Sequence, residues 1–145
     1  MKPVVTWIVL ANARNARVLE NRGPGKGLAE LAGKSWHAER ADMPRDKAGV
    51  GHSIAGHGVT AVDQNDPQLQ SETRFAQDVT RRLAKAHGAK EFDRLVLVSG
   101  PHMLGLLRAN LDERLLSVVA GEMAKDLSAQ PMDAVEAHLG EVIAI

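Results

Sequence analysis

The chain has 145 residues, of which 44% are apolar and 25% are charged. These values suit one soluble globular domain with one hydrophobic core, and the chain is too short for two ordinary domains. Cysteine is absent, which excludes disulfides, thiolate metal sites and cysteine nucleophiles.

Residues 4–11 are apolar and rich in β-branched side chains, which favours a buried strand, and residues 16–21 predict a second short strand. Asn12 and Asn15 are expected in the turn between them, because Asn tolerates a left-handed backbone. The two strands therefore predict a hairpin at the start of the chain.

Residues 23–27 (GPGKG) predict a loop, and residues 28–39 predict a third strand with a break near Gly33. Three strands joined by short connections indicate an antiparallel meander. Residues 41–65 have no clear period and are rich in glycine, so we expect a long glycine-rich loop within a single domain of residues 1–145.

The second half of the chain predicts helices and strands in alternation. The expected elements are a helix from Asp66 and Pro67 to about residue 87, a buried strand over residues 95–98, a short helix over residues 102–110, and a last helix opened by Pro131 with Val142 in its apolar spacing. Residues 115–127 are ambiguous between strand and helix.

This order predicts an α/β fold, in which a mixed sheet made of a three-strand antiparallel meander plus αβα units is covered by helices. The same order occurs in the ribonuclease H-like fold, an analogy that carries no function by itself. No apolar run approaches the roughly 18 residues of a membrane span, so we expect a cytoplasmic protein without membrane contact. A cleaved secretion signal is disfavoured because residues 4–10 are short for one and would be the first core strand.

Four segments stand out along the chain: residues 6–21 (TWIVLANARNARVLEN), 23–28 (GPGKGL), 66–76 (DPQLQSETRFA) and 92–108 (FDRLVLVSGPHMLGLLR), the last running on to 124–127 (AKDL). Together they resemble one bacterial family, the proteins required for attachment to host cells. Their order and spacing are specific, and they cover nearly the whole chain.

This resemblance implies a relation to the middle domain of the archaeo-eukaryotic peptide chain release factor, which has a ribonuclease H-like fold. It also implies that residues 117–125 are mostly strand. In the release factor, the loop before the first long helix carries a Gly-Gly-Gln tripeptide that enters the peptidyl transferase centre. The corresponding residues 41–65 hold no such tripeptide, so peptidyl-tRNA hydrolysis by that mechanism is not expected. A second departure is Asn12, where relatives often have Asp.

Catalysis of the ribonuclease H type needs several carboxylates around two metal ions. The chain offers no acid in the first strand, Glu72 in the first long helix and Ser99 at the end of the fourth strand. One carboxylate does not hold two metals, so we assign no metal, no cofactor and no catalytic residue. A serine hydrolase is disfavoured too, because Ala55 stands where the nucleophile elbow around Ser53 needs Gly.

The two glycine-rich loops offer weaker candidates. His52 and His57 would need a third ligand, such as His37 or Asp63, to hold a metal, so solvated loop histidines are favoured. Residues 23–27 lack the spacing of a phosphate-binding loop, which favours a hairpin whose glycines permit positive φ.

Ser99, Gly100 and His102 form a candidate ligand site, because they follow a buried strand and precede a helix. Open α/β sheets bind ligands at the carboxyl ends of their strands. The N-terminus of the following helix favours an anion, with His102 and Arg108 expected nearby. The alternative is a tight strand-to-helix turn with His102 exposed.

Basic side chains are candidates for contacting an RNA backbone, because phosphate contacts need charge and no aromatic platform. Aromatic residues make up only 3% of the chain, which disfavours base stacking. Lys plus Arg and Asp plus Glu number 18 each, which argues against a general polyanion binder, but residues 1–27 hold five basic side chains and one acidic. The RNA candidates are Arg14, Arg17, Arg22, Lys26, Arg74, Arg81, Arg82 and Lys85. The alternative is an ordinary solvated helix face, on which Asp78 pairs with Arg81 or Arg82.

Three functions stay open at this point. The first is a non-enzymatic binding protein of the host attachment family that contacts ribosome or RNA through a release-factor-like domain, so that attachment is affected indirectly. The second is a direct protein-interaction factor in attachment, which needs export or surface display. The third is a small hydrolase or ligand-binding enzyme that uses the His102 crevice. A homodimer through an exposed sheet edge is a further expectation.

Overall fold

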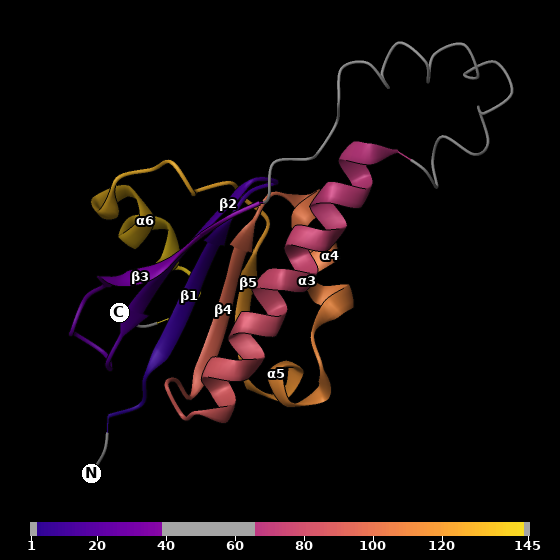
Figure 1. Ribbon diagram of the computed structural model, residues 1–145. Coiled ribbons are helices and arrows are strands. Elements are labelled where there is room, and N and C mark those ends of the chain that lie inside the picture. Colours follow the sequence, from indigo (N-terminus) through magenta and orange to yellow (C-terminus); the bar gives the residue numbers. More distant parts are fainter. Residues whose placement is uncertain (1–2, 39–65, 144–145) are drawn as a thin grey trace, which may run out of the picture.

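The computed structural model describes residues 3–38 and 66–143, in which five strands form one mixed sheet (Figure 1). The strands are β1 (Thr6–Ala11), β2 (Asn15–Asn21), β3 (Ala29–His37), β4 (Arg94–Ser99) and β5 (Val119–Met123), in the order β3-β2-β1-β4-β5. Strand β1 pairs antiparallel with β2 and parallel with β4, and β5 continues the parallel side. The predicted mixed sheet with an antiparallel three-strand meander is confirmed.

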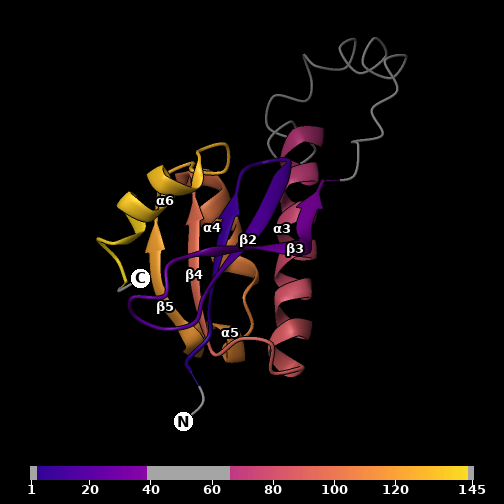
Figure 2. The same ribbon diagram turned by 90° about the vertical axis from the view of Figure 1, so that its left-hand side faces the viewer.

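Helices cover both faces of the sheet. They are α3 (Pro67–Gly88), α4 (Pro101–Asn110), α5 (Glu113–Val118) and α6 (Met132–Leu139). Helices α3, α4 and α5 lie on one face and α6 lies on the other (Figures 1 and 2). Alternation along the strands divides the core accordingly, because Val9 packs on the α3 side and Leu10 packs with Leu139 on the α6 side.

Helix α3 begins where the sequence predicts it. The side chain of Asp66 accepts a hydrogen bond from the backbone N–H of Gln68 at 3.0 Å, and Pro67 occupies the first helical position. The apolar stripe that includes Phe75, Val79 and Leu83 is buried against the sheet. The basic side chains of the helix therefore remain on its outer face.

The predicted break near Gly33 and the predicted turn between β1 and β2 are both present, but the turn forms for a different reason than expected. The register between β2 and β3 shifts opposite residues 17–19, and Gly33 has a φ of 82°, which is the expected break. The β1–β2 turn forms, but Lys90 is the only non-glycine with positive φ in the described parts of the chain. Asn12 makes the turn with its side chain instead, because its Oδ1 accepts from the N–H groups of Arg14 and Asn15 at 2.8 and 2.7 Å.

The expectation that residues 117–125 are mostly strand is confirmed by β5 (Val119–Met123), although the first two of these residues belong to a helix. Helix α5 runs to Val118 and only then does β5 begin. The helix forms because Oδ1 of Asp112 caps it, accepting from the N–H of Leu115 at 2.8 Å. The last helix is shorter than its apolar spacing suggests, since α6 ends at Leu139 and Val142 lies in the turn that follows.

No helix in the two described stretches of the chain is long and apolar enough to cross a membrane.

Candidate functional site

The parallel strands β1, β4 and β5 end at the same edge of the sheet, where α3 and α4 begin (Figure 1). Ser99 is the last residue of β4, Gly100 is the N-cap of α4 and His102 lies in the first turn of that helix. The structure therefore brings these three predicted residues together at the carboxyl end of β4.

Glu72 of α3 joins this group, which we call the β4-end cluster: Glu72, Ser99, Gly100 and His102. Its Oε2 lies 2.8 Å from Nε2 of His102, and its Oε1 accepts from the side chain of Gln68 at 3.1 Å. The Glu72 side chain is only 10% exposed, whereas that of His102 is 64% exposed. The contact joins the carboxylate of Glu72 to the Nε2 side of the His102 ring.

Ser99 is the unusual member of the cluster. It is fully buried, and its Oγ has no hydrogen-bond partner within the described parts of the chain. Its neighbours Leu95 and Leu97 point into the core on the α3 side, so alternation turns Ser99 toward the same helices. A buried hydroxyl without a partner costs about 1–3 kcal/mol, which makes this position worth testing for a ligand.

Arg108, which was expected beside His102, lies in the last turn of α4 at the other end of the helix. Its Nε donates to Oε1 of Glu122 in β5 at 2.7 Å. The hydrogen bond to Glu122 and, next, the charge of that carboxylate raise the pKa of Arg108. Arg108 is thus engaged with the sheet edge and does not join the β4-end cluster.

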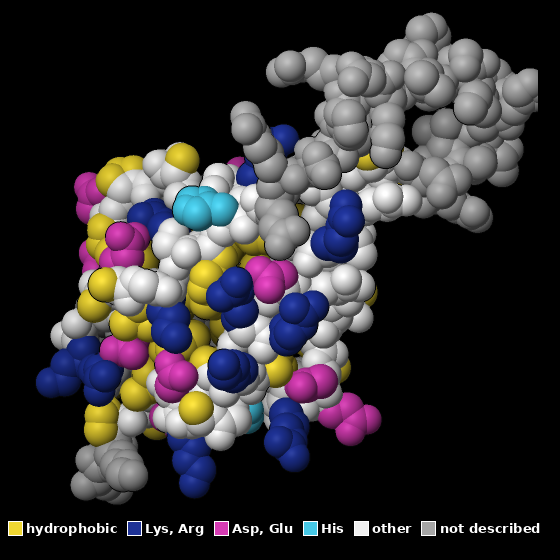
Figure 3. Space-filling view, viewed as in Figure 1, with side chains coloured by type: hydrophobic (Ala, Val, Ile, Leu, Met, Phe, Trp, Pro, Cys, Tyr) yellow, Lys and Arg dark blue, Asp and Glu magenta, His cyan; other side chains and the backbone are white. Residues whose placement is uncertain are grey.

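Four predicted RNA-contacting residues share the exposed face of α3 (Figure 3). Arg74, Arg81 and Lys85 are seven and four residues apart and so follow one line along the helix. Arg82 lies beside this line, where its Cζ is 5.6 Å from the ring centre of Trp36. We call these four side chains the α3 basic face.

Asp78 lies within the α3 basic face. One of its oxygens is 3.0 Å from Nε of Arg82, and the other is 3.7 Å from Nη1 of Arg81. The ion pairs that the sequence suggested are therefore both present. Four cations still surround one carboxylate, so the face stays positive.

The other predicted RNA-contacting residues lie elsewhere. Arg14 is in the β1–β2 turn, and Arg17 is held by Glu30 at 2.8 Å and by the backbone oxygen of Gln130 at 2.7 Å. Arg22 and Lys26 belong to the β2–β3 hairpin, which meets α6. The eight basic residues do not form one surface.

The hairpin loop follows the expectation for residues 23–27. Gly23, Gly25 and Gly27 all have positive φ, and the side chain of Asn21 donates to the backbone oxygen of Gly27 at 2.8 Å. His52 and His57 lie outside the described residues. Within the described residues, no group of three His, Asp or Glu side chains is placed to hold a metal ion.

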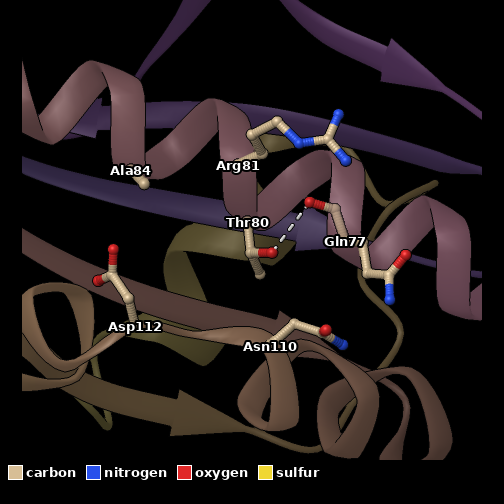
Figure 4. A pocket seen from close by; sticks show the side chains of 6 residues that line it. All are labelled: Gln77, Thr80, Arg81, Ala84, Asn110 and Asp112. Carbon is tan, nitrogen blue, oxygen red and sulfur yellow. Dashed lines mark hydrogen bonds between the residues drawn. The ribbon is translucent and has the colours of Figure 1, made fainter.

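A pocket that the sequence did not indicate lies between α3 and the link from α4 to α5 (Figure 4). It has a volume of about 370 Å³ and is lined by Gln77, Thr80, Arg81, Ala84, Asn110 and Asp112. No sequence pattern marks it, because the lining comes from segments about 30 residues apart that meet only when α3 packs beside α4. Arg81 belongs both to this pocket and to the α3 basic face.

Comparison with known proteins identifies a family. The family model described as "Protein required for attachment to host cells" matches residues 7–139, which run from β1 to the end of α6. A search of curated proteins gives no match. The family's name indicates a role in host cell attachment. Since the match spans nearly the whole chain, this chain belongs to the family of proteins required for attachment to host cells.

Proposed function

We propose that this chain serves host cell attachment indirectly, as a non-enzymatic cytoplasmic protein that binds RNA, free or in the ribosome, through the α3 basic face. The observation that carries the proposal is the line of exposed cations on α3. At a rise of about 1.5 Å per residue, Arg81 is about 10 Å from Arg74 and about 6 Å from Lys85 along the axis. Cations spaced in this way can contact successive phosphates of one strand without reading its bases.

The surroundings of the basic face favour an anionic partner. The side chains of Arg81 and Arg82 are 74% and 51% exposed. Arg82 is supported by the Trp36 ring, which fixes its position with little loss of its access to solvent. Asp78, which pairs with Arg81 and Arg82, limits the attraction.

We also propose that the fold is ribonuclease H-like and related to the middle domain of the release factor. The strand order β3-β2-β1-β4-β5, with an antiparallel β2 beside a central β1, supports this reading. A relation to a factor that works on the ribosome makes ribosomal RNA the first target to test.

The test is co-sedimentation with ribosomes, together with binding of a labelled single-stranded RNA, at low and moderate salt. The variant is Arg81→Glu with Arg82→Glu. The matched control is Arg22→Glu with Lys26→Glu, which changes the net charge equally in the hairpin beside α6. The α3 variant should lose binding, and the slope of log K against log salt should become shallower by about 0.7 for each phosphate that the variant no longer neutralises. Equal binding by both variants, or no binding by the wild type, would sink the proposal.

The reverse change gives a second prediction. Asp78→Asn removes the carboxylate that pairs with Arg81 and Arg82 and frees both cations. We expect RNA binding to tighten by roughly threefold to tenfold, in line with the charge dependence of phosphate contacts. Binding that weakens in Asp78→Asn would show that the carboxylate positions the arginines rather than opposing the ligand.

A second candidate function is the binding of a small ligand at the β4-end cluster. It is favoured by the Oγ of Ser99, which has no partner within the described residues, and by the Glu72–His102 pair at the same strand end. The probe is a panel of phosphorylated and carboxylated metabolites, measured by the shift of the melting temperature. A saturable shift that His102→Ala abolishes and Arg81→Glu leaves intact supports this site. Absence of any saturable shift across the panel removes this candidate.

A further inference from the structure

The pocket between α3 and the α4–α5 link borders the α3 basic face. Gln77 and Ala84 occupy the helix line next to the line of Arg74, Arg81 and Lys85, on the side of α4 and α5. An RNA strand that follows the cations therefore passes along the rim of this pocket. Figure 4 shows Thr80 and Ala84 of α3 opposite Asn110 and Asp112, with the guanidinium of Arg81 turned away from them.

The pocket has the size of a ligand site. Its volume of about 370 Å³ falls within the roughly 300–1,000 Å³ that small-molecule sites occupy. Ala84 contributes only a methyl group, which keeps the space open. The hydroxyl of Thr80 donates to the backbone oxygens of Ala76 and Gln77 at 2.9 and 3.1 Å. Its proton is therefore already used within the helix and is not offered to a ligand in the pocket.

Asp112 and Asn110 bring hydrogen-bond acceptors to the pocket from the side of the α4–α5 link. Asp112 uses Oδ1 to cap α5, and its Oδ2 has no hydrogen-bond partner among the residues that the structure describes. Asn110 donates its amide to the backbone oxygen of Leu106 at 2.7 Å, and its Oδ1 remains available. Gln77 adds an amide at the edge that both donates and accepts.

A base that fits these acceptors must present neighbouring N–H groups. Guanine is the one RNA base with two adjacent donors, N1–H and the N2 amine, on its Watson–Crick edge, and its O6 accepts from an amide such as that of Gln77. Proteins recognise unstacked RNA bases by hydrogen bonds to these edges and by stacking on arginine guanidinium planes as well as on aromatic rings. Arg81, at the rim, supplies the guanidinium in a chain with few aromatic residues.

We infer that this pocket receives an unstacked guanine from an RNA strand bound along the α3 basic face, with Asp112 and Asn110 accepting from its N–H edge. The inference rests on the proposed function and deepens it from phosphate binding to recognition of one base. The α3 basic face supplies affinity for any sequence, and the pocket supplies the preference.

The experiment uses oligouridylates that carry one central G, A or C, or an abasic residue, in fluorescence anisotropy with the full chain. The wild type should bind the G-containing strand roughly tenfold more tightly than the abasic strand, the effect of one well-formed base contact. Asp112→Asn should abolish this preference, and its binding to the abasic strand should equal that of Glu113→Gln, which removes the same charge. Asn caps helices as well as Asp does, so this variant keeps α5.

Two further variants test whether the preference for G depends on the pocket itself. Ala84→Met fills the pocket with a helix-compatible side chain and should also abolish the preference for G. Glu113→Gln, which changes charge by the same amount one residue outside the pocket, should keep it. Equal binding of the G, A, C and abasic strands, with binding still abolished in Arg81→Glu with Arg82→Glu, overturns the pocket but leaves the proposed function standing. A preference for another base overturns the guanine assignment, and no binding of any strand overturns both proposals.

Discussion

Ser99 and Glu72 are polar side chains at positions that belong to the core. Glu72 is held by Gln68 and His102, whereas the hydroxyl of Ser99 is buried without a described partner. The two residues differ in their effect on stability. A buried polar group with hydrogen-bond partners recovers most of its desolvation cost, whereas one without a partner does not.

Ser99→Ala should therefore stabilise the unliganded protein, by about 1 kcal/mol, because it removes a hydroxyl that is desolvated without forming a hydrogen bond. The measurement is urea unfolding, in which the midpoint should rise at an unchanged m value. The comparison is Ser128→Ala, which loses bonds to Asn12 and Asp126 and should destabilise. If Ser99→Ala lowers the midpoint as Ser128→Ala does, the Ser99 hydroxyl has a partner, such as a bound water.

The sequence indicated part of the β4-end cluster but not its chemistry. Ser99, Gly100 and His102 are neighbours in the chain, so a strand followed by a helix was enough to place them. Glu72 stands out in the sequence only as an isolated acid, because its contact with His102 joins two helices 30 residues apart. Arg108 was expected near His102, but it lies in the last turn of α4 and donates to Glu122. Nothing in the sequence marks Glu122 as its partner.

At the scale of elements, local signals decided what was predictable. The continuous apolar run of β1 and the Asp66-Pro67 start of α3 act within a few residues, and both elements form as expected. Val118, Val119 and Ala120 favoured strand, and Val119 and Ala120 do lie in β5. Val118 instead ends α5, which begins at the Asp112 cap.

The cap of α3 gives a prediction at this scale. Asp66→Ala should destabilise the protein by about 1 kcal/mol, because the N–H of Gln68 loses its acceptor at the helix start. Asp66→Asn preserves the cap, so its free energy of unfolding should lie within a few tenths of a kcal/mol of the wild-type value. Urea unfolding checks both. Equal stability of the Ala and Asn variants would mean that Asp66 does not hold the helix start.

At the scale of the whole molecule, one sheet separates two apolar layers. Trp7 and Trp36 lie in the layer under α3, whereas Leu139 is fully buried in the layer under α6. Both layers use alternate residues of the same strands, so a substitution that destabilises one layer should also destabilise the other.

Leu139→Ala tests the coupling. Loss of the side chain leaves a cavity under α6 and should cost about 2–5 kcal/mol. Tryptophan fluorescence reports the α3 layer and far-UV circular dichroism reports the whole fold, and we expect both midpoints to fall together. A fluorescence transition that stays at the wild-type midpoint would make the α6 layer an independent unit.

The parallel pairing of β1 with β4 also sets an order of events during synthesis. Thr6 pairs with Arg94, 88 residues later, and at about 5–20 residues per second the ribosome delivers the second strand roughly 4 to 18 s after the first. Throughout that interval β1 can pair only with β2, and its other edge stays open. The nascent chain must therefore hold its most apolar strand in a half-built sheet, which makes the first half of the protein the stage most exposed to aggregation and to chaperones.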